Sequence, residues 1–225
     1  MRIADASKRT VILGRTGSGK TVAGVWHLSL RNWREMPWVI LDYKGDSLIG
    51  KLPAKPITDW QVPKEPGLYV LRPMAKVDDD LVEYFLWQMK EQGNCGLYVD
   101  EGYMLPYDGK SDALNAILTQ GRSLRVPTII LSQRPVWLSR FVITEADFFQ
   151  VFWLNDSRDR VTLEAVIPAG VRERLPEYCS YYYDVGKDDL LKLEPVPMEE
   201  EILASFWQGI AKPEKSKKKL FFFGS

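Results

Sequence analysis

The sequence predicts an α/β fold in which a mostly parallel sheet carries helices on both faces. Short apolar runs alternate with stretches of helical periodicity, which is typical of chains built from strand–helix–strand units. The first runs are apolar at almost every position, as expected for strands buried on both faces. The first run also leads into a glycine-rich loop that a helical pattern follows. We expect strands at 10–13, 38–42, 67–73, 96–100, 128–133 and 149–154, and helices at 19–34, 78–92, 111–123, 157–166 and 198–210.

The other segments predict connections and ends. Residues 51–66 contain four prolines and predict a loop that crosses the surface. Further on, YCSYYYDVG and LLKLEP predict a small C-terminal hairpin, with the helix at 198–210 after it. Residues 212–225 begin with a cluster of lysines and predict a flexible tail. The expected organisation is therefore a single domain over 1–211 with a lysine-rich tail.

Composition excludes several classes of protein. The chain has 225 residues, 45% of them hydrophobic, which suits one α/β domain. Its net charge is zero, so any contact with nucleic acid must come from a local patch. Two cysteines, Cys95 and Cys179, predict a reducing compartment rather than a disulfide framework. We expect neither a transmembrane helix nor a signal peptide. The single histidine, His27, argues against a histidine triad or a multi-histidine metal site, and we expect it to pack in the core.

The loop GRTGSGKT after the first strand matches the phosphate-binding P-loop pattern G-x-x-x-x-G-K-T. Its glycines allow a tight turn that brings backbone amides close to phosphate oxygens. The helix that follows points unpaired N–H groups at the same anion. Lys20 would reach the β- and γ-phosphates, and the Thr21 hydroxyl would ligate Mg²⁺. A chance glycine-rich turn is the alternative, but the strand before the loop and the helix after it argue against one. The nucleotide-binding residues expected are Gly14, Arg15, Thr16, Gly17, Ser18, Gly19, Lys20 and Thr21.

Two acidic residues end the strand in CGLYVDEGYMLP. Asp100 would share Mg²⁺ with Thr21, and Glu101 would polarise the water that attacks the γ-phosphate. The alternative is a strand that ends in a solvated turn, and the P-loop in the same chain favours the catalytic interpretation.

A further strand, TIILS, ends at Gln133. Ligands of open α/β sheets lie at the carboxyl ends of the strands. Gln133 is therefore expected to contact the γ-phosphate or the attacking water, although a polar strand end without a role is the alternative. The segment VILDYKGD at 39–46 predicts by itself only a turn after a strand.

Taken in order, these motifs carry a resemblance to a known family. The P-loop, then h-h-h-D-x-K-G-D, h-h-h-D-E and G-R…h-h-h-S-Q-R-P (h, hydrophobic) resemble the FtsK–HerA superfamily of DNA-pumping ATPases, over residues 10 to about 176. The segment at 155–176, where D-S-R begins a helix, is similar to the one after the last core strand of that family. The short length and the lack of membrane segments look most like the genome-packaging ATPases of membrane-containing icosahedral phages and related viruses.

The resemblance implies a RecA-like P-loop fold that hydrolyses ATP with Mg²⁺ and translocates double-stranded DNA, most simply into a preformed capsid. It also implies a ring, typically a hexamer, with the nucleotide between subunits. Its location would be the host cytoplasm or the packaging vertex of the virion, with capsid vertex proteins as partners. An arginine of the neighbouring subunit would complete catalysis. We favour Arg122 for this role and Arg158 next, with Arg125 and Arg160 as the other candidates.

Two other functions fit parts of the pattern. An ATP-dependent assembly or secretion factor, like those of filamentous phages, also carries an N-terminal P-loop, but usually continues into a membrane span. A small-molecule kinase would need an arginine-rich lid and an acceptor pocket. The pair Asp100–Glu101 and the S-Q-R-P sequence favour hydrolysis. Lys110 and Arg140 are weak candidates for contacts with DNA phosphates.

Overall fold

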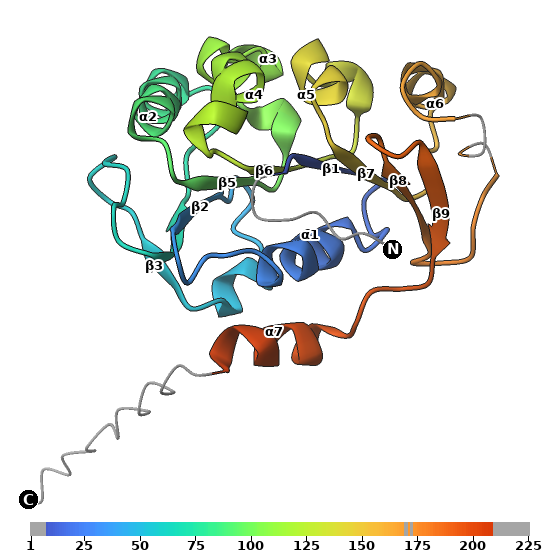
Figure 1. Cartoon of the computed structure of the whole chain (residues 1–225), viewed down its shortest axis with the longest axis horizontal. Helices are drawn as coiled ribbons and strands as arrows, with labels where there is room; N and C mark the ends of the chain where they lie inside the picture. Colours follow the sequence, from blue (N-terminus) through green and yellow to red (C-terminus); the bar gives the residue numbers. More distant parts are fainter. Residues whose placement is uncertain (1–7, 169–170, 172, 209–225) are drawn as a thin grey trace, which may run out of the picture.

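A nine-stranded sheet organises the described part of the chain in the computed structural model, which describes residues 8–168, 171 and 173–208 (Figure 1). The strand order is β3-β4-β2-β5-β6-β1-β7-β8-β9. All neighbours from β3 to β7 pair in parallel, whereas β8 and β9 form an antiparallel hairpin at one edge. The strands are β1 (Thr10–Leu13), β2 (Pro37–Leu41), β3 (Ala54–Pro56), β4 (Gly67–Leu71), β5 (Gly96–Val99), β6 (Thr128–Ser132), β7 (Phe148–Val151), β8 (Ser180–Asp184) and β9 (Asp189–Leu193).

The predicted α/β class, the mostly parallel sheet and the C-terminal hairpin are confirmed. The prediction of a plain loop over 51–66 is wrong in one part, because β3 lies within it and pairs with β4. Pro56 is compatible with this strand because β3 is an edge strand, where a missing backbone donor costs little. Proline content alone therefore could not exclude a short edge strand.

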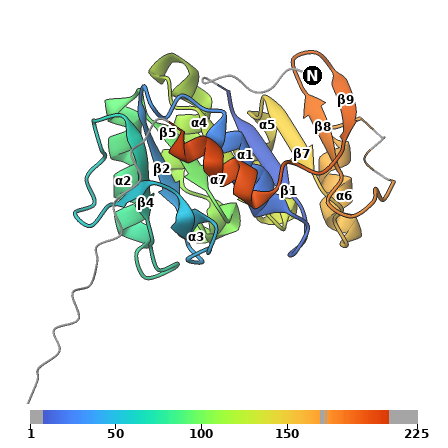
Figure 2. The ribbon, with the colours of Figure 1, turned by 90° about the horizontal axis from the view of Figure 1, so that it is seen from below.

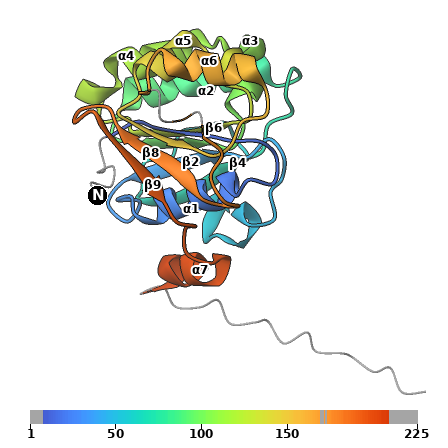
Figure 3. The same cartoon turned by 90° about the vertical axis from the view of Figure 1, so that its right-hand side faces the viewer.

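Helices cover both faces of the sheet (Figures 1 and 3). On one face lies α1, with α7 packed on its outer side, as Figure 2 shows from below. The other face carries α2, α4, α5 and α6. Their bounds are α1 (Lys20–Ser29), α2 (Asp79–Gln92), α3 (Pro106–Gly109), α4 (Asp112–Leu124), α5 (Arg140–Thr144), α6 (Ser157–Glu164) and α7 (Glu199–Trp207), with short 3₁₀ turns at Ile49–Lys51, Gly102–Met104 and Pro135–Trp137.

The first helix is shorter than predicted. It ends at Ser29 instead of continuing to residue 34. The amides of Leu30 and Arg31 bond to the carbonyls three residues back, which closes the last turn tightly. The short helices α3 and α5 were not predicted, because four or five residues are too few to show helical periodicity. The predicted tail at 212–225 lies outside the described residues, so the division into domain and tail stays a prediction.

The sheet separates two hydrophobic cores. One lies between the sheet and α2, α4 and α6, and includes Phe85 and Leu114. The other lies beneath α1 and α7, and includes Trp38 and Phe206. Gly96 admits the Trp38 ring, because a Cβ at this position would lie 2.1 Å from it. His27 is buried as expected.

The parallel strands align their carboxyl ends along one edge of the sheet. In β2 and β5, Leu41 pairs with Val99, and the amide of Asp100 donates to the carbonyl of Leu41 at 3.1 Å. In β1 and β6, Leu13 pairs with Ser132. The residues that follow these four strands therefore meet in one place. Within the described ranges, no helix has the length and apolar character needed to cross a membrane.

Candidate active site

The loop after β1 has the backbone that phosphate binding requires. Gly17 and Gly19 adopt left-handed conformations with φ of 75° and 88°, which other residues rarely tolerate. Gly14 has no room for a side chain, because a Cβ there would lie 2.5 Å from the Ser18 hydroxyl oxygen. Gly19 precedes α1 without a side-chain cap. The first amides of α1 are thus available to an anion.

Three side chains converge on the carboxylate of Glu101. Lys20 Nζ lies 3.5 Å from Glu101 Oε1, and Gln133 Nε2 donates to the same oxygen at 3.0 Å. Lys44 Nζ forms a third contact with this oxygen. Glu101 is fully buried, and its other oxygen, Oε2, has no hydrogen-bond partner. Two lysines therefore balance the charge of one buried carboxylate. The second oxygen of this carboxylate is free to accept a proton or a hydrogen bond.

Asp100 and Thr21 form the second part of the site. The Thr21 hydroxyl donates to Asp100 Oδ1 at 3.2 Å. Burial raises the pKa of Asp100 to about 6, with the Lys44 charge opposing this shift and the Glu101 charge adding to it. Asp100 Oδ2 is buried without a hydrogen-bond partner. A hydroxyl and a carboxylate oxygen are hard donors that suit Mg²⁺.

No group of three or more His, Cys, Asp or Glu that could hold a metal lies within the described residues. A metal at Thr21 and Asp100 would thus complete its coordination with phosphate oxygens and water, as Mg²⁺ does in nucleotide sites.

Gln133 links the P-loop to Glu101. Its Oε1 accepts from the Thr16 hydroxyl at 2.6 Å, while its amide nitrogen donates to Glu101. The structure therefore brings together Lys20, Thr21, Asp100, Glu101 and Gln133, which the sequence placed at separate strand ends. Their individual roles stay predictions.

Sequence reasoning missed Lys44 as a site residue. Its segment predicted only a turn, although the D-x-K-G-D pattern contributed to the family resemblance. In the structure, Asp42 builds this turn by accepting from the Asp46 amide at 3.0 Å and from Arg72 Nε at 2.9 Å. The turn brings Lys44 to Glu101 because β2 is the neighbour of β5. A pattern of strand ends does not reveal which strands are neighbours.

Arg134, next to Gln133, was also missed. Its guanidinium forms ion pairs with Asp156 at 2.9 Å and with Asp159 at 2.8 Å, and lies 4.5 Å from the centre of the Trp137 ring. The carboxylate of Asp156 also accepts from the Arg158 amide and so caps α6. Arg134 thereby joins the end of β6 to the start of α6. The arginine of the S-Q-R-P motif and the aspartate of the D-S-R motif are thus partners in one ion pair.

The candidate arginine fingers belong to helices α4 and α6 or follow them directly. Arg122 lies in α4, and its side chain is outside the described residues. Arg160 donates to the carbonyls of Leu154 and Asn155 at 2.7 and 2.9 Å, which argues for a structural role. Arg158 is exposed on α6, and Arg125 follows α4. The choice among Arg122, Arg125, Arg158 and Arg160 stays a prediction.

The fold and these side chains together define a P-loop nucleoside triphosphatase site with an Asp–Glu pair. The chain is 43% identical, over 217 residues, to the DNA packaging ATPase P9 of Enterobacteria phage PRD1, an alignment that spans 92% of this chain and 95% of P9. It therefore belongs to the family of DNA packaging ATPases that includes P9. No family model matches the chain.

Solved structures show the same fold at lower identity. The genome packaging NTPase B204 of Sulfolobus turreted icosahedral virus 2, in complex with AMPPCP, has a TM-score of 0.71 at 22% identity, over 86% of this chain and 100% of that one. EssC (ATPases 2 and 3) of Geobacillus thermodenitrificans has a TM-score of 0.63 at 15% identity, over 92% of this chain and 46% of that one. The family expected from the motifs is thus confirmed.

Proposed function

We propose that this protein hydrolyses Mg²⁺·ATP to drive double-stranded viral DNA into a preformed capsid. The convergence of Lys20, Lys44 and Gln133 on Glu101, beside the P-loop, is the observation that carries the chemistry. The relationship to P9, which is named as a DNA packaging ATPase, supports packaging as the work done. The host cell, during the filling of capsids, is the corresponding place of action.

The residues divide the hydrolytic step between them. The P-loop amides and Lys20 hold the β- and γ-phosphates, and Mg²⁺ at Thr21 and Asp100 would neutralise charge on their oxygens. Glu101 accepts a proton from the attacking water as the water oxygen bonds to the γ-phosphorus and the bond to ADP breaks. Gln133, fixed by Thr16, orients this water. Lys44 pairs with the buried Glu101 and holds it in place.

Lys20 has two competing partners in this scheme. It lies 3.5 Å from Glu101, and a bound triphosphate would attract the same ammonium group. Lys44 and Gln133 remain on Glu101 when Lys20 turns to the phosphates. The arrangement therefore keeps the base paired throughout a cycle.

We also propose a ring, with six subunits as the typical number, in which Arg122 of one subunit reaches the phosphates bound by the next. DNA would pass through the channel and be contacted at its phosphates without regard to sequence. Lys110 and Arg140 are exposed and so available for such contacts. Capsid vertex proteins would anchor the ring. A kinase or a secretion factor has no comparable support, since the family relationship is to a packaging ATPase.

Lys20→Ala tests the proposal. The variant should lose phosphate release by a factor of about a thousand or more, because the charge that meets the β- and γ-phosphates is gone. Folding should survive, since Lys44 and Gln133 still satisfy Glu101. Phosphate release with and without double-stranded DNA, together with thermal denaturation, measures both effects. Lys51→Ala, at an exposed lysine, is the control.

Wild-type turnover by Lys20→Ala would refute the P-loop assignment. A motor should respond to DNA, whereas a kinase should ignore it. A secretion factor should instead depend on membranes or a partner protein.

A further inference from the structure

The charged residues of the site indicate where the γ-phosphate of a bound nucleotide lies, and therefore in which direction the nucleoside extends. Lys20 and Thr21 face Glu101 and Asp100 at the end of β5, with Gln133 at the end of β6. These strands lie on one side of β1, and β7 with the hairpin β8–β9 lies on the other. A γ-phosphate directed at Glu101 leaves the nucleoside on the side of β7. This step rests on the proposed function.

A cavity of about 370 Å³ lies on that side. It touches Gly19 and Val22, at the end of the P-loop and in the first turn of α1. Its other walls are Phe152, Tyr178, the segment 195–198, which joins β9 to α7, and the first two glutamates of α7, at positions 199 and 200. Ligand sites of small molecules are mostly apolar clefts of roughly 300–1,000 Å³, so the size and lining suit a nucleoside.

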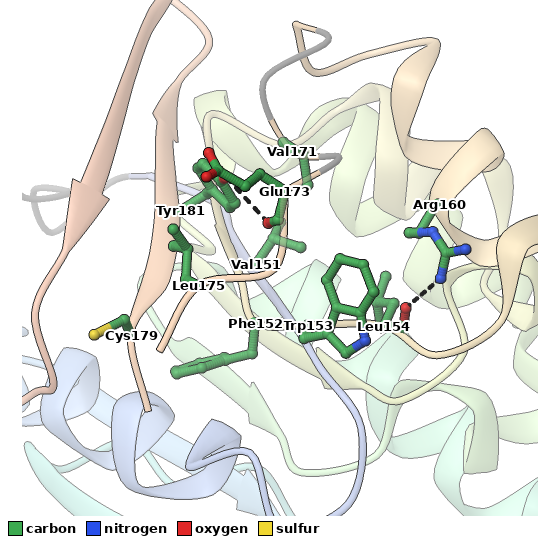
Figure 4. A pocket seen from close by; sticks show the side chains of 10 residues that line it. All are labelled: Val151, Phe152, Trp153, Leu154, Arg160, Val171, Glu173, Leu175, Cys179 and Tyr181. Carbon is green, nitrogen blue, oxygen red and sulfur yellow. Dashed lines mark hydrogen bonds between the residues drawn. The ribbon is translucent and has the colours of Figure 1, made fainter. Parts of the chain in front are cut away.

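Two aromatic rings lie close to Gly19, the residue before α1. A Cβ built on Gly19 would lie 3.2 Å from Tyr178 Cδ1 and 3.9 Å from Phe152 Cε1. Phe152 is buried, whereas Tyr178 is 50% exposed. Figure 4 shows Phe152 extending from the end of β7 toward Cys179, the residue after Tyr178. Phe152 is thus a buried part of the cavity lining, whereas Tyr178 is accessible to a ligand.

Tyr178 is held in an unusual backbone conformation. Its φ is 61°, in the left-handed region that bulky residues seldom occupy. Such strain persists where the surrounding structure requires it, and it is common at ligand-binding positions. Here it directs an aromatic ring onto the P-loop, next to the place where the sugar and base must emerge.

Two neighbouring cavities fit a nucleoside less well. The one drawn in Figure 4 measures about 10 Å³, which is room for one water at most. The other, about 380 Å³, shares the rings of Phe152 and Tyr178, but it lies against Arg15 and Gly17 and its lining is mostly polar, with Arg174 and Glu177. The lining of the first cavity is mostly apolar, so an aromatic base loses less hydration-dependent free energy by binding there.

We propose that the cavity bounded by Val22, Phe152, Tyr178 and residues 195–198 binds the ribose and base of ATP, with the base stacked on Tyr178. Stacking recognises the π-face that every base has, so this subsite adds affinity for nucleotides over inorganic phosphates. Phosphate binding and base binding are thereby assigned to opposite sides of β1.

Competition against a fluorescent ATP tests this assignment with two unlabelled ligands, ATP and inorganic tripolyphosphate, both with Mg²⁺. Tyr178→Ala should weaken ATP binding roughly 5- to 100-fold, the range expected for the loss of one stacking partner. Tripolyphosphate should bind this variant as it binds the wild type. Tyr178→Phe should behave like the wild type with both ligands.

Tyr107→Ala is a matched control, because Tyr107 has a similar exposed fraction of 49% and a φ of 56°. It lies at the turn α3, away from the cavity lining, and should leave ATP affinity unchanged. The base would have to lie elsewhere if Tyr178→Ala kept full affinity for ATP, or if it weakened both ligands equally. Failure of the wild type to bind either ligand would instead refute the nucleotide site itself.

Discussion

The two sides of β1 differ in how their side chains are held. Toward β5 and β6, the buried Glu101 is held by direct contacts with Lys20, Lys44 and Gln133. Toward β7 and the hairpin, Tyr178 contacts the P-loop by packing and keeps half of its surface exposed. Transferring a phosphoryl group needs charges fixed in advance, whereas holding a base needs only an apolar face.

The same difference is visible in the backbone. The side that carries the charges follows parallel strands whose ends are in register. The other side follows β7, the last of the parallel strands, and two connections, one before β8 and one after β9. Substitutions on the first side should therefore change hydrolysis, and substitutions on the second should change nucleotide affinity.

The largest expected effect belongs to the arginine that would complete the charged side. Arg122→Ala should bind ATP almost normally but lose a factor of about 10³–10⁵ in hydrolysis, because a finger acts only in the transition state. Glu101→Gln should also bind ATP and hydrolyse it very slowly, since the water loses its base. Mixing the two variants should raise activity above either alone, because some interfaces then combine an intact Glu101 with an intact Arg122.

Phosphate release by the mixture, with co-assembly checked by size, measures this recovery. Lys51→Ala mixed in the same way is the control, because Lys51 is exposed and is not a candidate finger. Co-assembled variants without recovery would show that Arg122 acts in its own subunit or not at all. Arg158 would then be tested next.

A smaller effect is expected from Lys44, which acts through Glu101. Lys44→Met removes a charged hydrogen-bond donor from a buried carboxylate, an interaction typically worth about 1.5–3 kcal/mol. Hydrolysis should fall roughly 10- to 100-fold in kcat, with little change in KM, because Lys20 and the P-loop still bind the phosphates.

Steady-state kinetics on Lys44→Met and on Lys51→Met measure the difference. Lys51 forms an exposed ion pair with Glu199, and such pairs contribute little to stability. Lys51→Met should therefore leave kcat and KM unchanged. An unchanged kcat in Lys44→Met would mean that Lys20 and Gln133 suffice to position Glu101. A rise in KM alone would assign Lys44 to phosphate binding.

The smallest expected effect is on the free energy of unfolding, and it concerns His27, which contacts Gln150 of β7. Burial lowers the pKa of His27 from 6.5 to about 3, and the charge of Arg31 acts in the same direction. Between these values the unfolded chain binds a proton that the folded chain does not. Stability therefore falls as the pH falls through this window, by up to about 1.4 kcal/mol per pH unit. His27→Phe should remove this part of the acid sensitivity.

Urea unfolding at pH 7 and pH 5 compares the slopes of the two proteins. The variant leaves Gln150 Oε1 without its partner, a cost that is the same at both pH values and cancels in the comparison. Asp100, whose pKa is raised to about 6, contributes the opposite slope, but to both proteins alike. Identical slopes for wild type and variant would show that His27 is not held neutral.

Several features of the protein were readable from the sequence because they are local. The strand–loop–helix order and the glycines of GRTGSGKT predict a phosphate loop, since the turn and its amides belong to consecutive residues. Asp100 and Glu101 follow one strand and Gln133 follows another, and parallel strands bring such ends to one edge. The family resemblance rested on the same short motifs, and it is confirmed.

Only the tertiary structure decided which of these ends touch. The neighbours β2 and β5 are separated in sequence by β3, β4 and α2, so the contact of Lys44 with Glu101 depends on the strand order. The pairing of Arg134 with Asp156, and the packing of Tyr178 against Gly19, likewise join segments distant along the chain. A sequence pattern specifies local backbone geometry and which side chains can be buried. The order of the strands instead depends on the way in which the long connections pack over the sheet. Many weak contacts together determine that packing.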